Sequence, residues 1–362
     1  MGNGKKLSKS FDLGTAASLV LVAFGVQVVF QLIVSLFPLA ANVRTWIIVV
    51  GNQLVFFGAV LVFARLKAVD PLAIAGAKEP PKWYYFPLFV LIAIACVTCF
   101  APMSGLFKRL LGKLGYDYMP QYYIPREPGA FTLAFLGLTL LPVIGEEFML
   151  RGALMSGAKK RSPLFAILYT ALIFALLHGN LNQLIHQFLL GAVMGYLAYL
   201  TGGIYASAAV HMTNNAVALL LDYGFAHNFI NHKFYYYIAG ELGATETLVG
   251  ISLSFFGLVL LLVLVTCLMH RDRSQIKDYF SVEGSVGDKI TAYLIYLSTP
   301  TVDREKEARA EIYGEEPLDL DREDPAISRR RRPMESYTLL MVILLAAVLG
   351  AIVLLSLIPG VN

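Results

Sequence analysis

The sequence predicts an all-α membrane protein in which about nine helices cross the bilayer. Hydrophobic residues make up 57% of its 362 residues and charged residues only 15%, whereas a soluble domain averages about 25% charged residues. Apolar runs recur that approach the length of about 20 residues needed to span a bilayer. Basic clusters flank these runs, as membrane topology signals do. This placement of charge gives no indication of nucleic-acid binding.

The first three spans are expected at residues 16–37, 46–64 and 84–103. Lysines at positions 5, 6 and 9 precede the first span, which places the N-terminus on the cytoplasmic side by the positive-inside rule. Apolar and basic residues then alternate within residues 104–129, a pattern that predicts a short interfacial helix followed by a loop. Residues 1–129 are therefore expected to form an N-terminal set of membrane helices with an interfacial segment.

The remaining spans are expected at residues 130–155, 164–178, 183–200, 204–221, 247–269 and 338–358. Residues 130–222 contain a core of about four of these helices, each close to the spanning length. Residues 223–269 hold an external loop and the eighth span. Residues 270–337 form a charged cytoplasmic segment that could dock a protein partner, and residues 338–362 hold the last helix. This topology puts the C-terminus outside, and the style of the loops indicates a bacterial cell membrane.

Three charges lie close together near the end of the fourth span, at Glu146, Glu147 and Arg151. Ionisable residues inside a membrane are costly unless they are paired or face a polar cavity, so they indicate a functional site. Glu147 and Arg151 are four residues apart and can form an ion pair on one helix face. Glu146 lies about 100° further round the helix and is left without a local partner.

Further polar residues fall at matching depths on later spans. Glu146 and His178 each lie about 15 residues from the turn that joins their helices, roughly 20 Å along each axis, so the two side chains are expected at one level. A carboxylate and a histidine at one level can activate water as a nucleophile. His211 and Asn215 share a face of the seventh span, and as donors they could stabilise an oxyanion.

Each of these residues also has a purely structural interpretation. A histidine in a transmembrane helix often forms an interhelical hydrogen bond, and His186 and Asn182 carry only that interpretation. Gly191 and Gly195 form a G-x-x-x-G pattern, which predicts close helix packing. The functional interpretation depends on the co-occurrence of the six ionisable and amide residues within a short stretch of apolar sequence.

The ordered motifs Glu146-Glu147-x-x-x-Arg151, Phe174-x-x-x-His178 and His211-x-x-x-Asn215 resemble the CPBP family. Its members are the CAAX-protease and bacteriocin-processing intramembrane proteases, also called the Abi or type II CAAX prenyl endopeptidase family. The resemblance covers roughly residues 130–222.

The resemblance implies an intramembrane endopeptidase and a role for each motif residue. Glu146 would be the catalytic carboxylate that polarises water together with His178. His211 and Asn215 would stabilise the oxyanion, and Glu147, Arg151 and Phe174 would support the site. The partners would be the lipid bilayer and a membrane-associated protein or peptide substrate, with prenylated substrates left open.

A metal ion is an open question at this stage. Zinc takes nitrogen, sulfur and carboxylate ligands, and Glu146, His178 and His211 could supply them. The H-E-x-x-H motif of many zinc proteases is absent from the sequence. The family has been described both as metalloproteases and as metal-independent glutamate proteases, and metal-independent water activation is the interpretation favoured here.

Two other functions compete with the protease. The first is a non-catalytic membrane scaffold or immunity protein of the same fold that binds a membrane partner, for which the charged segment at 270–337 is the main argument. The second is a transporter that uses buried carboxylates as a proton relay. Such transporters are built from internal repeats, and the sequence shows none.

Overall fold

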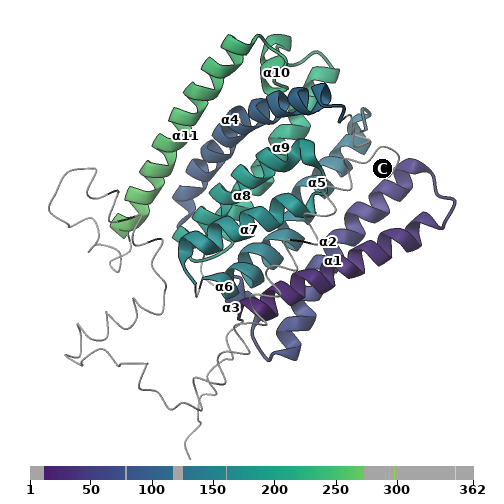
Figure 1. The fold of residues 1–362 in the computed structure, drawn as a ribbon, viewed down its shortest axis with the longest axis vertical. Helices are drawn as coiled ribbons and strands as arrows, with labels where there is room; N and C mark the ends of the chain where they lie inside the picture. The colour runs from purple at the N-terminus through teal and green to yellow at the C-terminus, as the bar shows by residue number, and fades with distance from the viewer. Residues whose placement is uncertain are drawn as a thin grey trace, which may run out of the picture.

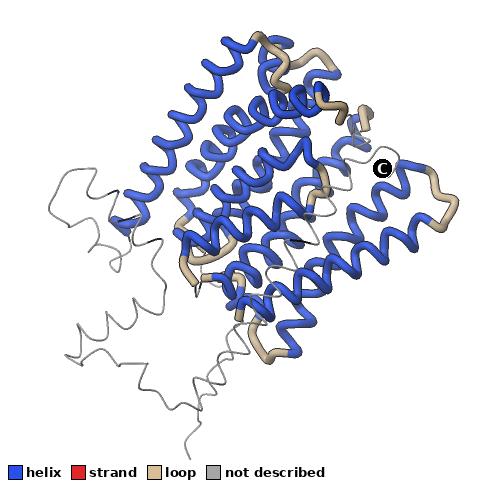
Figure 2. The backbone as a smooth tube through the Cα atoms, in the orientation of Figure 1, coloured by secondary structure: helices blue, strands red, loops and turns tan. Residues whose placement is uncertain are grey.

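The computed structural model describes residues 12–77, 80–116, 125–159 and 161–272, together with the isolated positions 290, 293, 297 and 347. Every regular element in this part of the chain is a helix, and no strand occurs in it (Figure 2). The predicted all-α class is confirmed.

The helices form a single bundle in which α11 lies at one side and the α1–α2 hairpin at the other (Figure 1). Helix α4 packs against α8, α9 and α11, while α5 packs between α2 and α9. In chain order the elements are α1 (Leu13–Ser35), α2 (Ala41–Leu66), α3 (Pro71–Ile74), η1 (Trp83–Tyr85), α4 (Phe86–Lys113), α5 (Pro128–Glu147), η2 (Phe148–Leu154), α6 (Met155–Ala158), α7 (Pro163–Leu177), α8 (Leu181–Thr201), α9 (Tyr205–Ala226), α10 (His232–Ile238) and α11 (Ala244–Asp272).

Six helical segments in the described residues are long and apolar enough to cross a membrane: Leu13–Ser35, Ala41–Leu66, Trp83–Lys113, Pro128–Ala158, Leu181–Thr201 and Ala244–Met269. Helix α7 is apolar but shorter, with 15 residues, and α9 has 22 residues but carries several polar side chains. The protein is an integral membrane protein. The span expected at 338–358 lies outside the described residues except for position 347, so the count of nine spans and the orientation of the termini stay predictions.

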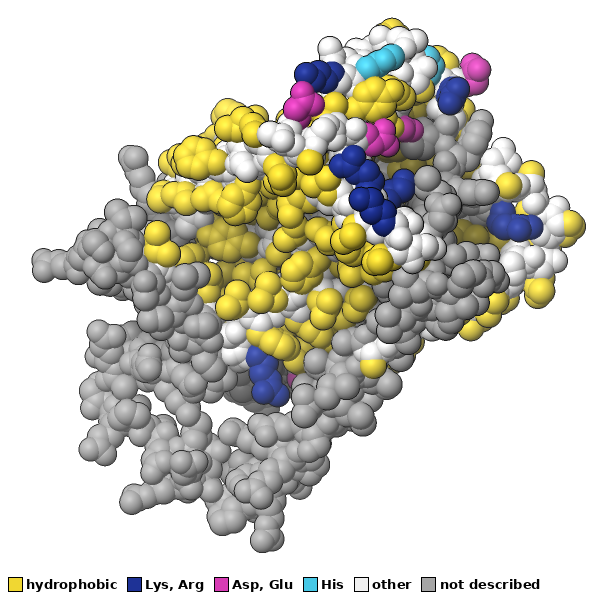
Figure 3. All heavy atoms as spheres, turned by 45° about the horizontal axis from the view of Figure 1, so that its top comes forward, with side chains coloured by type: hydrophobic (Ala, Val, Ile, Leu, Met, Phe, Trp, Pro, Cys, Tyr) yellow, Lys and Arg dark blue, Asp and Glu magenta, His cyan; other side chains and the backbone are white. Residues whose placement is uncertain are grey.

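The flank of the bundle is apolar, as contact with lipid requires. Leu253, Phe255, Phe256 and Val263 of α11 are all more than half exposed. Figure 3 shows hydrophobic side chains spread over the middle of the visible face, with charged side chains mostly above and below this area. An exposed apolar surface of this kind is what a bilayer covers.

The short interfacial helix predicted within residues 104–129 is not a separate element. Helix α4 instead runs from Phe86 through Pro102 to Lys113, so that residues 104–113 are its last turns. Proline tends to break helices in water. In a membrane helix proline is tolerated, because neighbouring helices and local changes of helix type supply hydrogen bonds to the backbone groups that it leaves unpaired. The alternation of apolar and basic residues is the amphipathic end of the same helix.

Helices α7 and α8 lie in close contact because of the glycines on α8. A Cβ atom on Gly191 would lie 3.0 Å from Ala171 Cα and 3.1 Å from a ring carbon of Phe174, and one on Gly195 would lie 3.4 Å from Ile167 Cα. The close packing predicted from the G-x-x-x-G pattern is confirmed. The Phe174 ring packs against Gly191 in this contact and is buried inside the bundle.

Candidate active site

A change of helix type follows the two adjacent glutamates. Glu146 and Glu147 are the last residues of α5, and the chain continues directly into the π-helix η2 (Phe148–Leu154), which carries Arg151. π-helical turns are rare and occur frequently at functional sites. Here the π-helical segment carries Arg151, whose side chain contacts Glu147.

Glu147 lies at the centre of a buried charge network. Arg151 Nη1 donates a hydrogen bond to Glu147 Oε1 at 2.9 Å, and both side chains are fully buried. His211 Nδ1 donates to the same oxygen at 2.8 Å. Arg151 Nη2 also donates to the carbonyl of Gly191 at 3.3 Å. The predicted ion pair is confirmed, and its hydrogen-bonded partners offset part of the cost of burying charge.

Glu146 has a different environment although it is the neighbouring residue. Its side chain is 13% exposed, and its Oε2 lies 3.9 Å from His211 Nε2. Gln53 Nε2 of α2 donates to Glu146 Oε1 at 2.9 Å. Within the described residues, Oε2 accepts no hydrogen bond. Glu146 therefore has one positioned oxygen and one oxygen that is free to take a proton.

The tautomers of the two site histidines follow from their partners. His178 Nδ1 donates to the carbonyl oxygen of Phe174 at 2.8 Å, and His211 Nδ1 donates to Glu147. A carbonyl oxygen and an ionised carboxylate can only accept, so each Nδ1 carries the hydrogen. In the neutral ring, Nε2 of each histidine then presents a lone pair. His178 is also close enough to Glu146 and His211 for electrostatic interaction.

Phe174 is the contact point of the cluster. The Arg151 guanidinium lies over its ring at 4.6 Å from the centroid. The His178 and His211 rings meet it edge to face, with centroids 4.9 Å and 5.6 Å away. A cation over an aromatic face is stabilised by the ring quadrupole. The three motifs are thus brought together around one phenyl ring.

Asn215 lies at the side of the cluster nearest to α5. Its Nδ2 donates to the carbonyl of Leu138 at 3.2 Å, and its Oδ1 accepts from Asn214 Nδ2 at 3.3 Å. Asn214 Oδ1 in turn accepts from His186 Nε2 at 3.3 Å. The second N–H of Asn215 has no hydrogen-bond partner in the described part of the chain.

Sequence reasoning missed Gln53, Asn214 and the involvement of His186. Gln53 lies in an apolar run far from the motifs, and its neighbour Asn52 is the only other residue that marks the run as polar there. A polar pair in the middle of a span was the available signal, since polar residues inside a membrane generally serve a purpose. Gly145 allows the contact, because a Cβ atom there would overlap both the side chain and the backbone of Gln53.

The residues named for zinc do not form a metal site in this structure. In the described ranges, no group of three or more histidine, cysteine, aspartate or glutamate side chains comes close enough together to hold a metal ion. Glu147 and the Phe174 carbonyl engage the Nδ1 atoms of the two histidines, so their Nε2 atoms are the ones that could face a ligand.

The family assignment rests on the residues that hold this cluster. Residues 128–217 match the family model described as type II CAAX prenyl endopeptidase Rce1-like. No curated protein and no solved structure matches the chain. The CPBP family is a protease family, and its matched segment contains all the motif residues from Glu146 to Asn215.

Proposed function

We propose that the protein is an intramembrane endopeptidase that hydrolyses a peptide bond of a membrane-associated protein or peptide. One observation carries the proposal: Glu146 Oε2 and His211 Nε2 face each other at 3.9 Å. With His211 neutral, both atoms are hydrogen-bond acceptors. A group that donates to both is needed between them, and a contact of this length is commonly bridged by water. This bridging water is the nucleophile.

The reaction follows from the positions of these side chains. Glu146 takes a proton from the bridging water as general base, and the water oxygen forms a bond to the carbonyl carbon of the substrate. The C=O electron pair moves to its oxygen, which becomes an oxyanion. The C–N bond then breaks, and Glu146 returns the proton to the leaving nitrogen. The products are a carboxylic acid and an amine.

The other residues of the cluster hold the reacting groups in place. Glu147 fixes the tautomer and orientation of His211, and Arg151 balances the charge of Glu147. His178, whose Nδ1 bonds to the Phe174 carbonyl, has an Nε2 lone pair that is free to accept a hydrogen bond in the site. The second N–H of Asn215 is a donor for the oxyanion. The distance to Glu146 favours His211 as the water-orienting residue, a role that differs from the oxyanion role implied by the resemblance.

The test compares peptide termini in membranes of host cells that carry the wild type or Glu146→Gln at equal level. The introduced amide keeps an oxygen beside Gln53 but cannot take a proton from water. We expect termini that appear with the wild type and disappear with the variant. The effect of general-base loss is about 100-fold or more. Identical termini would contradict the protease and favour the non-catalytic scaffold of the same fold.

A second prediction concerns metals. We propose that water activation uses Glu146 and the histidines alone. The support is that no three histidine, cysteine, aspartate or glutamate side chains of the described residues form a group that could hold a metal ion. Cleavage in the same membranes is then expected to persist after treatment with a strong zinc chelator. Loss of cleavage on chelation, followed by recovery on adding zinc, would contradict metal-independent activation and leave the protease itself supported.

A further inference from the structure

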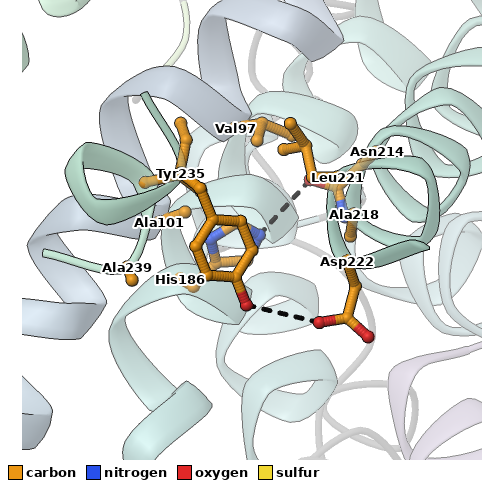
Figure 4. Close-up of a pocket in the computed structure, with 10 residues that line it drawn as sticks. Val97, Ala101, His186, Asn214, Ala218, Leu221, Asp222, Tyr235 and Ala239 are labelled. Carbon is orange, nitrogen blue, oxygen red and sulfur yellow. Dashed lines mark hydrogen bonds between the residues drawn. The ribbon is translucent and has the colours of Figure 1, made fainter. Parts of the chain in front are cut away.

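A cavity of about 190 Å³ lies beside the active site, between α4, α8, α9 and α10. Its walls come from one face of α9 and from the facing sides of α4 and α10 (Figure 4). The lining residues are Val97, Ala101, His186, Asn214, Ala218, Leu221, Asp222, Tyr235, Ile238 and Ala239.

The polar residues of the cavity are paired with one another. His186 Nε2 donates to Asn214 Oδ1 at 3.3 Å, and the Tyr235 hydroxyl donates to Asp222 Oδ1 at 3.3 Å; both bonds are dashed in Figure 4. The rest of the lining is made of alanine, valine, leucine and isoleucine and is apolar. An apolar guest therefore leaves these two hydrogen bonds intact and packs against the apolar part of the lining.

The wall formed by α10 is held in place by close contacts with α4. The Tyr237 hydroxyl donates to the Thr98 carbonyl at 2.7 Å. A Cβ atom on Gly105 would overlap the Ala239 carbonyl, so the two backbones touch there. The cavity is thus a preformed feature of the bundle, as binding pockets usually are.

The inner end of the cavity connects to the catalytic cluster. Asn214, which lines the cavity, donates to Asn215 Oδ1 at 3.3 Å. This bond occupies the oxygen of the Asn215 amide, so its N–H groups are the atoms left for other partners. Through Asn214, the wall of the cavity is hydrogen-bonded directly to a residue of the catalytic cluster.

We propose that this cavity is a specificity subsite that binds one apolar side chain of the substrate next to the scissile bond. The inference rests on the proposed function. A cavity of about 150 Å³ in another protein holds benzene, so about 190 Å³ accommodates one side chain the size of leucine, methionine or phenylalanine. It lies below the range of about 300–1,000 Å³ typical of larger ligands. The Asp222 carboxylate disfavours an acidic side chain.

The experiment changes the size of the cavity in opposite directions. Ala101→Leu narrows it, and Leu221→Ala enlarges it. The matched controls alter lipid-facing positions on the same helices: Ile94→Phe on α4, where Ile94 is 40% exposed, and Leu220→Ala on α9, where Leu220 is 50% exposed. Peptide termini in host membranes are compared for each variant, the wild type and Glu146→Gln, and the residues flanking the cleaved bond are counted.

With the wild type we expect a medium-sized apolar residue at one position beside the cleaved bond. Ala101→Leu should shift that position to smaller residues and Leu221→Ala to larger ones, with relative preferences changed by about 10–200-fold, while both controls match the wild type. Opposite shifts cannot come from misfolding. An unchanged residue preference in both cavity variants, with cleavage retained, would overturn the subsite alone. Absence of any termini dependent on Glu146 would overturn the proposed function, and the subsite with it.

Discussion

Two adjacent glutamates receive opposite environments in this structure. The Glu147 side chain has no exposed surface and shares one oxygen between Arg151 and His211, whereas Glu146 is 13% exposed with one oxygen unengaged in the described residues. Adjacent helix positions point about 100° apart, so one faces the cation and the other faces the space beside His211. In many enzymes two nearby carboxylates have different roles because their surroundings differ in polarity and hydrogen bonding.

The buried ion pair between Glu147 and Arg151 is expected to matter for the stability of the protein. Arg151→Met removes the cation and leaves the Glu147 carboxylate buried without its ion-pair partner, which is expected to destabilise the protein by about 3–5 kcal/mol. Adding Glu147→Gln to Arg151→Met should recover part of that loss, because it removes the uncompensated charge. Unfolding of the three proteins in the same detergent measures the difference. A double variant no more stable than Arg151→Met would contradict the charge argument.

Gln53 is expected to act as a positioning residue for Glu146. Gln53→Leu removes the 2.9 Å hydrogen bond, and misplacement of a reacting group by about 1 Å can lower the rate about 100-fold. We expect a fall in kcat with little change in the level of folded protein.

Gln53→Glu supplies the control for this prediction. Two carboxylates at that distance cannot both be ionised easily, so the pair keeps its hydrogen bond while it holds one proton. Cleavage by this variant should persist at low pH and be lost as pH rises, over a range in which the wild type stays active. A pH profile identical to that of the wild type would show that Gln53 does not act on Glu146.

At the level of elements, the contact between α2 and α5 helps to determine where the Glu146 carboxylate lies. Gly145 lets the α2 backbone approach α5 at Gln53, since a Cβ atom would overlap it. The π-helix η2 then redirects the chain, so that Arg151 reaches Glu147 and the Phe174 ring. A glycine contact and a π-helical turn together place three ionisable side chains within one bundle.

Gly145→Ala tests the role of this contact. The added methyl group should push α2 away from α5, weaken the bond from Gln53 to Glu146 and reduce cleavage. Gly58→Ala is the matched control on α2, because a Cβ atom there meets nothing within 4 Å. Alanine is favoured over glycine in a helix by about 1 kcal/mol, so the control should be as stable as the wild type or more so, with unchanged cleavage. Equal activity of the two variants would contradict a role for the contact.

At the level of the whole molecule, the family segment does not contain the complete site. Residues 128–217 hold the motif residues, but Gln53 comes from α2, and the cavity is closed by Val97 and Ala101 of α4 and by α10. The helices around the matched segment therefore contribute Gln53, which bonds to Glu146, and most of the walls of the cavity. The shared chemistry of a family and the selectivity of one member can thus reside in different parts of the chain.

The all-α membrane class, the Glu147–Arg151 pair and the set of motif residues could be predicted from the sequence. Hydrophobic run length and helical spacing are local properties, and they report which residues share a helix face. The uninterrupted α4, the π-helix, the bond from Gln53 to Glu146 and the cavity beside His186 could not be predicted in this way. Each depends on which helices are in contact and at which level along their axes. Such contacts join residues as far apart in the sequence as Gln53 and Glu146, and they leave no hydrophobic periodicity in the sequence that would reveal them.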